Sequence, residues 1–444
     1  MSTKAPLPPT GTRDFLPDAV RRRRYVMDII SRCFERHGYE PLETPAMERL
    51  DVLLGKYGEE GDKLLFKVLH RGEKLKRVLE NLPIFESDLS ELGLRYDLTV
   101  PLARVAANYP EQLTRIFKRY QIQPVWRADR PAKGRFREFF QCDVDILGSS
   151  EILAELDIFC AIGEIMHELG LPDFELHINH RQWLSAFLRA LHIPDTQHIP
   201  VLGVLDKLDK VGPEAVLEEL QAKNLSETCR KDLPDWFARF TIKHLQPQDC
   251  MSLVDAQGQA ALDTLSYVLQ WDARRNTRIV WNPLLARGLD YYTGLIYELR
   301  IPPIPSSFGG GGRYDHLIGM FSGRFVPAVG FSFGLERLLD LLEERQLFPL
   351  LTAHAQVVAI ILDATVTAWA LDVISNLRSQ GISVDLYPEI SGIGKALKWV
   401  NRKKVRWALF LGPDEQTQNQ VSWKDLFTGA SGKSAPSEIV HLLQ

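Results

Sequence analysis

Cysteine is scarce in this sequence. Its five cysteines are widely spaced, no two of them form a C-x-x-C pair, and none is paired in sequence with a histidine ligand: Cys33, Cys142, Cys160, Cys229 and Cys250. Structural zinc sites and disulfide frameworks are built from closely spaced ligands. The sequence therefore predicts neither of them, and it assigns no metal ligand.

Long apolar runs are missing as well. No window approaches about 18 uninterrupted apolar residues, the length that a membrane-spanning helix requires. The first residues, MSTKAPLPPTGTRDFLPD, contain no apolar segment of the kind found in secretory signals. We therefore expect a cytoplasmic protein that does not enter a membrane.

Neither sign of charge dominates. The 53 lysines and arginines are nearly balanced by 57 acidic residues, and the formal net charge is -4. Any contact with nucleic acid must therefore depend on a local basic patch, because no polycationic face is available. With 444 residues, 45% of them hydrophobic, the chain is long enough for two or three globular domains.

Hydrophobic periodicity organises the first part of the chain. Apolar residues at helical spacing from Val26 predict an amphipathic helix that stops at Gly38, and the prolines at 41 and 45 predict an edge strand or extended arm of the kind that meets a second subunit. Residues 138–147 have a strand period that places Gln141, Asp143 and Asp145 on one face. We interpret that face as the floor of a pocket.

The rest of the chain divides into three further parts. Residues 195–275 are rich in helical patterns and poor in glycine, which predicts an inserted helical module. Strand patterns return after it and lead to a helix that ends near Phe348, and beyond a short linker strands alternate with helices, as is typical of a small α/β domain. The predicted boundaries are 1–194, 195–275, 276–348 and 355–444.

The most basic segment combines eight cations with a single acid, Asp129. The cations are Arg115, Lys118, Arg119, Arg127, Arg130, Lys133, Arg135 and Arg137. Turn-forming residues interrupt the run, which predicts a loop that joins two strands and carries arginines. Guanidinium groups hold phosphate oxygens in pairs, so this hairpin suits a triphosphate or a polynucleotide end. A merely solvated charged face is the alternative.

Three other motifs leave alternatives open. The glycine run at 309–312 is typical of a phosphate cradle or of close backbone approach, and Arg337, at a helix start, faces a phosphate or pairs with Glu336. Asp97 and Thr99 share one face of a predicted strand, where they capture an ammonium group or cap a helix that begins near Pro101. TGASGKS is rejected as a P-loop, because Phe427 stands where that motif needs glycine.

Together these segments resemble the class II aminoacyl-tRNA synthetases, and within that class the histidyl-tRNA synthetase family. The segments are GTRDFLP (11–17), YEPLETPAME (39–48), WRADRPAKGRFREFFQCDVD (126–145), ARGLDYYTG (286–294), SFGGGGRYD (307–315), GFSFGLERL (330–338) and ALKWVNRKKVRWALFLG (396–412). The resemblance covers nearly the whole chain, and the motifs occur in the family's order.

The resemblance implies a fold and an activity. The fold is an α+β catalytic domain with an antiparallel sheet, a helical insertion and a C-terminal α/β anticodon-binding domain. The activity is the ATP-dependent ligation of L-histidine to tRNA(His) through a histidyl-adenylate, with Mg²⁺ accompanying ATP and a homodimer as the assembly. A non-catalytic paralogue that senses histidine or tRNA is the alternative, and it would be expected to lack the phosphate-binding cations and the C-terminal domain.

The resemblance also implies roles for individual residues. Those for histidine are Asp97, Thr99 and Gln141 at the α-amino group, Asp145 and Tyr292 at the imidazole, and Tyr291 and Tyr314 lining the pocket. Those for ATP are Arg127 and Arg287 at the α-phosphate, Asp129 near adenine, where the family pattern has Glu, and Arg135 and Arg337 at the outer phosphates. Those for tRNA are the loop 133–137 and the basic segment with Lys395, Lys398, Arg402, Lys403, Lys404 and Arg406.

Overall fold

The structure is a computed structural model that describes most of the chain. The described residues are 6–56, 61–132, 134–205, 208–222, 227–240, 245–275, 277–286, 291–349, 355–403 and 405–443. They form two compact units, Met1–Leu347 and Phe348–Gln444, here called the N-terminal and C-terminal units. Among the described helices, none is both long enough and apolar enough to cross a membrane.

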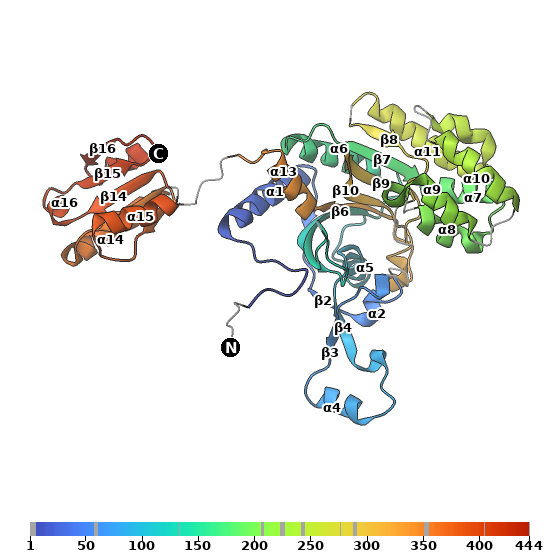
Figure 1. The fold of residues 1–444 in the computed structure, drawn as a ribbon, viewed down its shortest axis with the longest axis horizontal. Coiled ribbons are helices and arrows are strands. Elements are labelled where there is room, and N and C mark those ends of the chain that lie inside the picture. The colour runs from blue at the N-terminus through green and yellow to red at the C-terminus, as the bar shows by residue number, and fades with distance from the viewer. Residues whose placement is uncertain are drawn as a thin grey trace. The chain divides into compact units, whose positions relative to one another are not determined.

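An eight-stranded sheet organises the N-terminal unit (Figure 1). In spatial order its strands are β1 Glu40–Pro41, β5 Phe117–Trp126, β6 Glu138–Leu147, β11 Ala328–Gly334, β10 Ile304–Arg313, β9 Leu295–Ile301, β7 Glu175–His180 and β8 Ile279–Trp281. All neighbours pair antiparallel except the two edge pairs, β1 with β5 and β7 with β8. The prediction of an α+β unit with an antiparallel sheet is confirmed, and β1 is an edge strand.

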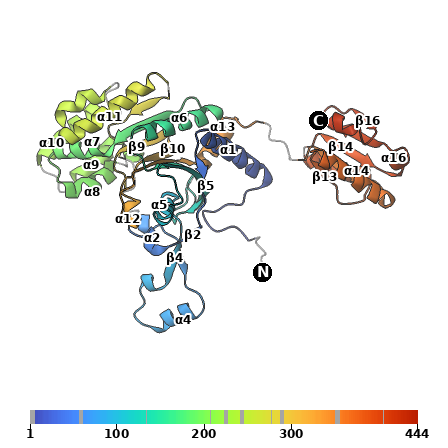
Figure 2. The same ribbon diagram turned by 180° about the vertical axis from the view of Figure 1, so that it is seen from behind.

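Three helices cover one face of this sheet. They are α1 Pro17–Arg36, α6 Leu153–Glu168 and α13 Leu335–Glu344, and α1 contacts both of the others (Figure 2). The predicted apolar positions of α1 are buried, and the chain turns away at Gly38, which has a φ of 77°. Burial of this apolar helix stripe against the apolar side of the sheet supplies the core. The opposite side of β5, β6 and β11 is left to polar residues.

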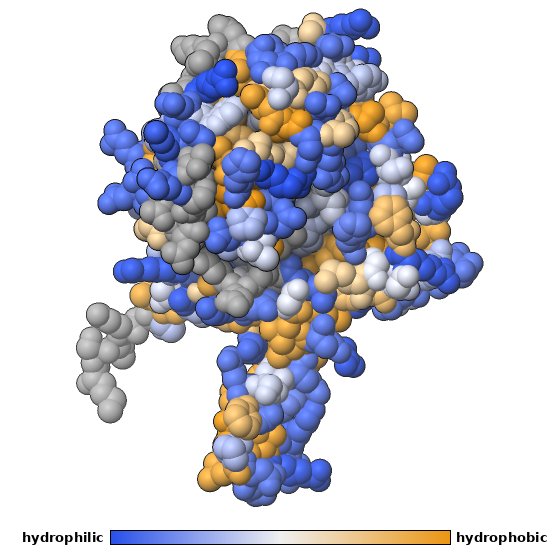
Figure 3. Space-filling view, turned by 90° about the vertical axis from the view of Figure 1, so that its right-hand side faces the viewer, coloured by the Kyte–Doolittle hydropathy of each residue, from blue (hydrophilic) through white to orange (hydrophobic). Residues whose placement is uncertain are grey.

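A narrow projection extends from the N-terminal unit. Its three-stranded sheet has the order β2 Met47–Arg49, β4 Ser90–Leu94 and β3 Lys67–Leu69, and it carries α2 Leu50–Leu53, α4 Glu73–Glu80 and η1 Glu86–Asp88. Figure 3 shows the projection standing out from the body. None of the residues of α4 is buried. The sequence did not predict α4, and it predicted α5 Thr99–Asn108 only as an alternative, as a helix that begins near Pro101.

Helices fill the chain between β7 and β8, as predicted. They are α7 Arg181–Ala190, η2 Asp195–Gln197, α8 His198–Leu205, α9 Leu208–Gln221, α10 Glu227–Phe240, η3 Pro247–Leu253 and α11 Ala256–Asp272. Aromatic rings hold this module to the sheet: Trp183 stacks on Phe187 and meets Trp281 of β8 edge-on. A break at Gly212, with a φ of 83°, precedes Pro213 inside α9.

The C-terminal unit is a small α/β domain. Its sheet has the order β13 Val384–Leu386, β12 Val357–Ile361, β14 Trp407–Leu411, β15 Val421–Asp425 and β16 Ser431–Ser434, with helices α14 Thr367–Ser379, α15 Ile393–Lys403, α16 Pro413–Thr417 and α17 Ile439–Leu443, and with η4 Ala364–Val366. The first three strands are parallel, and each sheet face has its own apolar cluster. The rejected P-loop motif lies in the β15–β16 hairpin.

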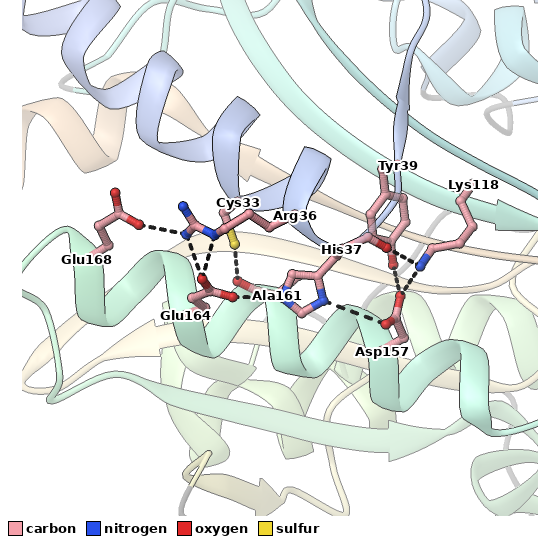
Figure 4. A network of polar contacts seen from close by, with 9 residues as sticks. All are labelled: Cys33, Arg36, His37, Tyr39, Lys118, Asp157, Ala161, Glu164 and Glu168. Carbon is pink, nitrogen blue, oxygen red and sulfur yellow. Dashed lines mark hydrogen bonds and ion pairs between the residues drawn. The ribbon is translucent and has the colours of Figure 1, made fainter.

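Ion pairs fasten the end of α1 to α6 (Figure 4). Glu164 accepts hydrogen bonds from Arg36 at 2.9 and 2.6 Å and contacts His37 Nε2 at 2.8 Å. The thiol of Cys33 lies beneath them, and the potential ligand atoms of Cys33, His37 and Glu164 lie within 4.8 Å of one another. The sequence prediction missed this cluster, because Cys33 and His37 are one helical turn apart but Glu164 comes from a distant helix. Its carboxylate is already neutralised by Arg36.

Asp157 is the second acceptor at this junction. It accepts hydrogen bonds from Tyr39 at 2.6 Å, forms an ion pair with Lys118 at 2.9 Å and lies 3.6 Å from His37 Nδ1. Burial alone would raise the pKa of the Asp157 carboxyl, but the hydrogen bonds from Tyr39 and Lys118 outweigh it and hold that pKa below its usual value. Asp157 therefore stabilises the fold in its ionised form.

Asp157→Asn should destabilise the N-terminal unit by about 1 kcal/mol at pH 7, because the side chain is 33% exposed and solvent screens its contacts. The pKa of the Asp157 carboxyl is lower in the folded protein than in the unfolded chain. The ionised carboxylate therefore stabilises the fold fully above the unfolded pKa, and this stabilisation is lost as pH falls through the folded pKa. The difference in thermal midpoint between wild type and variant should therefore shrink as pH falls through the folded pKa of Asp157. Glu343→Gln, which removes an exposed ion pair with Arg22, is the matched control and should have little effect.

Candidate functional site

A cavity of about 800 Å³ opens over the polar side of β6. It is lined by nearly all of the residues predicted for a site: Asp97, Thr99, Arg127, Asp129, Arg135, Gln141, Asp145, Tyr291, Tyr292, Tyr314 and Arg337. Arg287 lies outside the described residues, as does Lys133, although Ala286 and Tyr291 on either side of the undescribed segment both line the cavity. Segments far apart in the chain thus converge on one space.

Strand register creates the floor of the cavity. In the β5–β6 pair Arg119 lies opposite Asp145 and Gln121 opposite Asp143. On the other side of β6, Asp145 lies opposite Gly330 of β11. Directly opposed residues share a face of the sheet, so these polar side chains all point away from the helices. The predicted grouping of Gln141, Asp143 and Asp145 follows from this alternation.

The floor is strongly acidic. Asp145 accepts a hydrogen bond from the Tyr314 hydroxyl and forms an ion pair with Arg119 at 2.7 Å. Burial raises the pKa of the Asp145 carboxyl, and Arg119 and Tyr314 oppose the rise. For Asp143, burial and the charge of Asp145 outweigh Arg119 and raise the pKa to about 7. Such perturbed carboxyls are typical of ligand-binding sites.

The position of Arg119 differs from the prediction. It was counted among the cations of a phosphate-binding loop, but its side chain is fully buried in β5. Lys118, its neighbour, reaches the other side of the sheet and pairs with Asp157. Successive residues of a strand point to opposite faces, which separates Arg119 from Lys118. The prediction for Arg119 was wrong because a cation inside a strand cannot be distinguished in sequence from one in the following loop.

Asp97 and Thr99 lie at a helix start rather than in a strand. Helix α5 begins at Thr99, two residues before Pro101, and Asp97 Oδ1 accepts a hydrogen bond from the backbone N–H of Val100 at 3.0 Å. The capping alternative is therefore correct for one carboxylate oxygen. Both residues also line the cavity, so capping fixes an acid at its edge.

Arg127, Arg135 and Arg337 also line the cavity, and they are here called its basic end. Arg127 donates to the Tyr96 carbonyl at 3.2 Å, with its guanidinium 4.3 Å from the centre of the Tyr96 ring. Arg135 lies 3.7 Å from Asp129 at the mouth. These contacts hold the arginines in place without fully neutralising them, as an anion site requires.

Arg337 contacts the glycine-rich strand β10. It donates a hydrogen bond to the Ser307 carbonyl at the start of the glycine-rich part of β10. Glu336 instead pairs with Arg23 of α1 at 2.9 Å and accepts from the backbone N–H of Phe140. Glu336 therefore ties α13 to α1 and β6, and Arg337 is oriented toward the cavity that it lines.

The glycine run in β10 allows close approach of backbone. A Cβ on Gly311 would lie 2.0 Å from the Gly330 carbonyl, and one on Gly309 would lie 2.5 Å from the Phe331 ring. Of the two alternatives, close backbone approach is correct at these positions, and the run is a strand rather than a loop. Gly309, Gly310 and Gly311 also line the cavity, which leaves room for a flat ligand above them.

Three tyrosines form a wall beside the acidic floor. The ring centre of Tyr291 is 5.1 Å from that of Tyr292 and 5.8 Å from that of Tyr314. Their edge-on packing fixes the rings and aims Tyr314 at Asp145. The cavity thus offers a slot with rigid walls, an acidic end for a cationic group and a basic end for phosphates.

Sequence reasoning missed part of the floor. Asp143 shared the predicted face but received no role, and Arg119, Gly330 and Ser332 were not predicted as part of the floor. A Cβ on Gly330 would lie 1.9 Å from Asp145 Oδ1, and Ser332 accepts a hydrogen bond from Gln141 at 2.9 Å. The alternation of residues along β5 and β11 identifies these floor residues, but only when the register in which the strands pair is known.

Family models cover nearly the whole chain. The model described as histidyl-tRNA synthetase matches residues 11–338, and the model described as anticodon binding domain matches residues 356–444. These two matches meet where the N-terminal and C-terminal units divide.

Individual relatives agree with the family models. A histidine–tRNA ligase of Cytophaga hutchinsonii is 39% identical over 98% of both chains, and one of Flavobacterium johnsoniae is 37% identical over 95% of both. Among solved structures, the histidyl-tRNA synthetase of Nostoc sp. PCC 7120 superposes with a TM-score of 0.79 at 29% identity, covering 100% of this chain and 99% of the other.

Gly330→Ala should displace Asp145, because the new methyl group would overlap its carboxylate. We expect a loss of about 1–3 kcal/mol in the free energy of unfolding of the N-terminal unit, measured as a lower thermal midpoint. Gly334→Ala on the same strand is the control, since its Cβ would meet only the Phe308 carbonyl at 3.6 Å. Equal midpoints for the two variants would contradict the close packing described for Gly330.

Proposed function

The chain belongs to the histidyl-tRNA synthetase family, and from this premise we propose that its cavity activates L-histidine with ATP and that the protein transfers the histidyl group to tRNA(His). The first step is attack of the histidine carboxylate on the α-phosphorus of ATP, which forms histidyl-adenylate and releases pyrophosphate. In the second, a terminal ribose hydroxyl of the tRNA takes the histidyl group and AMP leaves. The convergence of an acidic slot and a basic end in one cavity carries this proposal.

Histidine occupies the acidic slot in this proposal. Its ammonium group meets Asp97, Thr99 and Gln141, and the Gln141 side chain has a buried oxygen with no hydrogen-bond partner among the described residues. The imidazole N–H donates to Asp145, and the other ring nitrogen meets the Tyr292 hydroxyl. A site that must satisfy both nitrogens rejects rings lacking them, because its own buried polar groups would be left unpaired.

ATP occupies the basic end. Arg127 and Arg287 hold the α-phosphate from two sides, Arg135 and Arg337 hold the outer phosphates, and Asp129 lies near adenine. Fixed cations there offset the repulsion between carboxylate and phosphate and stabilise the charge of the in-line transition state. The carboxylate is ionised at neutral pH, so no general base is needed.

The proposal also includes a magnesium ion, a homodimer and a cytoplasmic location. Mg²⁺ travels with the ATP phosphates, which supply most of its ligands, so no dedicated protein cage is required. The edge segment β1 and its prolines are proposed to contact a second copy in a homodimer, and the protein is proposed to act in the cytoplasm. The catalytic domain comprises 1–194 and 276–348, interrupted by the helical insertion 195–275.

The tRNA spans both units in this proposal. Its acceptor end lies over the loop 133–137, and its anticodon region contacts helix α15 of the C-terminal domain, 355–444. Lys398 and Arg402 on α15 are exposed and form no ion pair with a described residue, whereas Lys395 and Lys403 pair with Glu389 and Asp385. Exposed cations on one helix suit phosphate contacts. Lys404 lies outside the described residues, and Arg406 pairs with Asp425.

The non-catalytic alternative is not favoured. A histidine- or tRNA-sensing paralogue needs no triphosphate site, yet Arg127, Arg135 and Arg337 line the cavity. The match to an anticodon-binding domain over 356–444 also argues against it. Each of these features has a use in aminoacylation.

Arg287→Ala should reduce histidine-dependent exchange of labelled pyrophosphate into ATP by roughly 10²–10³-fold, as expected for loss of a cation that stabilises the transition state. Arg274→Ala removes an exposed arginine just after α11 and serves as the control. Absence of exchange in the wild type would reject the enzymatic proposal, and a full rate in the Arg287 variant would reject only the role of that residue.

Reversing the charge of Lys398 and Arg402 together, as Lys398→Glu with Arg402→Glu, should raise the KM for tRNA in a charging assay by about tenfold at moderate salt, because phosphate contacts dominate such affinities. Pyrophosphate exchange should stay at the wild-type rate. Lys433→Glu reverses the charge of one exposed lysine of β16 in the same unit and controls for a charge reversal outside α15. Unchanged charging kinetics in the double variant would exclude α15 from tRNA binding.

A further inference from the structure

A single buried arginine lies beneath the acidic floor of the cavity. Asp143 and Asp145 are each 2% exposed, and Arg119 is the only described cation that forms an ion pair with either of them. Arg119 is 0% exposed and, unlike the two aspartates, is not among the residues that line the cavity. It therefore acts on a ligand only through the carboxylates above it.

The geometry of Arg119 joins the two carboxylates. Its Nη2 lies 2.7 Å from Asp145 Oδ2 and 3.9 Å from Asp143 Oδ2. Nη1 donates to Gln121 at 3.2 Å and Nη2 to the Leu98 carbonyl at 3.4 Å, whereas Nε has no hydrogen-bond partner among the described residues. Because the guanidinium is a rigid fork, these two bonds hold the cation beside the aspartates.

We propose that Arg119 is a positioning residue for amino-acid specificity, which holds Asp145 as an ionised, acceptor-only carboxylate facing the imidazole slot. This inference rests on the proposed function, since it assigns a cause to the selection of histidine at that site. An ionised carboxylate accepts hydrogen bonds but cannot donate them, so it requires an N–H from the ligand. A protonated Asp145 would offer a donor as well, and the requirement would be lost.

The charges around the aspartates show why a cation is needed. Burial favours the neutral form of both carboxyls, and the charges of Asp145 and Asp97 further oppose ionisation of Asp143. Arg119 from β5 is the cation that opposes this, while Tyr314, which follows β10, donates to Asp145. Ser332 from β11 is the neutral group that lowers the pKa of Asp143.

Removing the cation should therefore change how histidine binding depends on pH. Without Arg119 the pKa of Asp145 rises further, so more of the carboxyl is protonated at neutral pH and ionisation returns only as pH increases. In Arg119→Met we expect the KM for histidine in pyrophosphate exchange to rise on the order of tenfold or more near pH 7. The ratio of variant to wild-type KM should fall as pH rises from 6 to 9, and this ratio cancels the titration of free histidine. The KM for ATP should change little.

Two variants separate this effect from a loss of packing. Arg95→Met removes another buried arginine, 1% exposed, which donates to the Thr44 and Pro124 carbonyls and acts on Asp143 only through its charge, without a hydrogen bond. It should lower stability without making the KM ratio for histidine depend on pH. Arg119→Met with Asp143→Asn removes the neighbouring like charge as well, and should recover part of the histidine KM.

Each outcome of these experiments either supports or contradicts the role of Arg119. A pH-dependent KM ratio in Arg119→Met, together with partial recovery in the double variant, supports the inference. A pH-independent ratio overturns it, as does an equal rise in the KM for ATP. If Arg119→Met does not fold, Arg119→Lys, which keeps the charge, replaces it. Its KM for histidine should lie within about threefold of the wild-type value. A pH-independent rise of that KM above about tenfold also overturns the inference. Failure of the wild type to exchange pyrophosphate rejects the proposed function itself.

Discussion

The chemistry of this protein depends on the register in which β6 pairs with β5 on one side and β11 on the other. That register places Asp145 between Arg119 and Gly330, and Asp143 between Gln121 and Ser332. A slip of one residue would turn the polar set toward the helices and expose Cys142, Val144 and Ile146 in its place. The apolar packing of α1, α6 and α13 thus secures the orientation of residues on the opposite side of the sheet.

Burial and function oppose each other in the floor of the cavity. Three nearly inaccessible acids, Asp97, Asp143 and Asp145, share one end of it, and the buried arginine offsets only part of their charge. An arrangement of this kind costs folding free energy, because buried charges are stabilised only when they are paired. In the proposed function a cationic ligand completes the pairing, because its positive charge offsets the charge of these acids.

Much of this architecture could be predicted from sequence, and the failures have physical causes. The period of residues 138–147 correctly placed Gln141, Asp143 and Asp145 on one face, and the apolar spacing from Val26 correctly predicted α1. Arg119 was misplaced, because a run of cations looks alike whether it lies inside a strand or in the loop after it. The start of α5 was placed too late, since its cap at Asp97 was read as strand. The Cys33, His37 and Glu164 cluster brings together two segments whose packing no local pattern encodes.

The order of the strands along the chain determines when each of them can pair during synthesis. Strand β6 ends at Leu147, but its partner β11 begins only at Ala328, after the helical insertion and the four strands β7 to β10 have been made. Until then a growing chain on the ribosome holds an open sheet edge beside exposed carboxylates, and such edges invite association with other chains. The acids of the floor, which repel one another and remain hydrated, also repel their counterparts on neighbouring nascent copies. The acids that are buried in the finished protein thereby discourage aggregation before folding is complete.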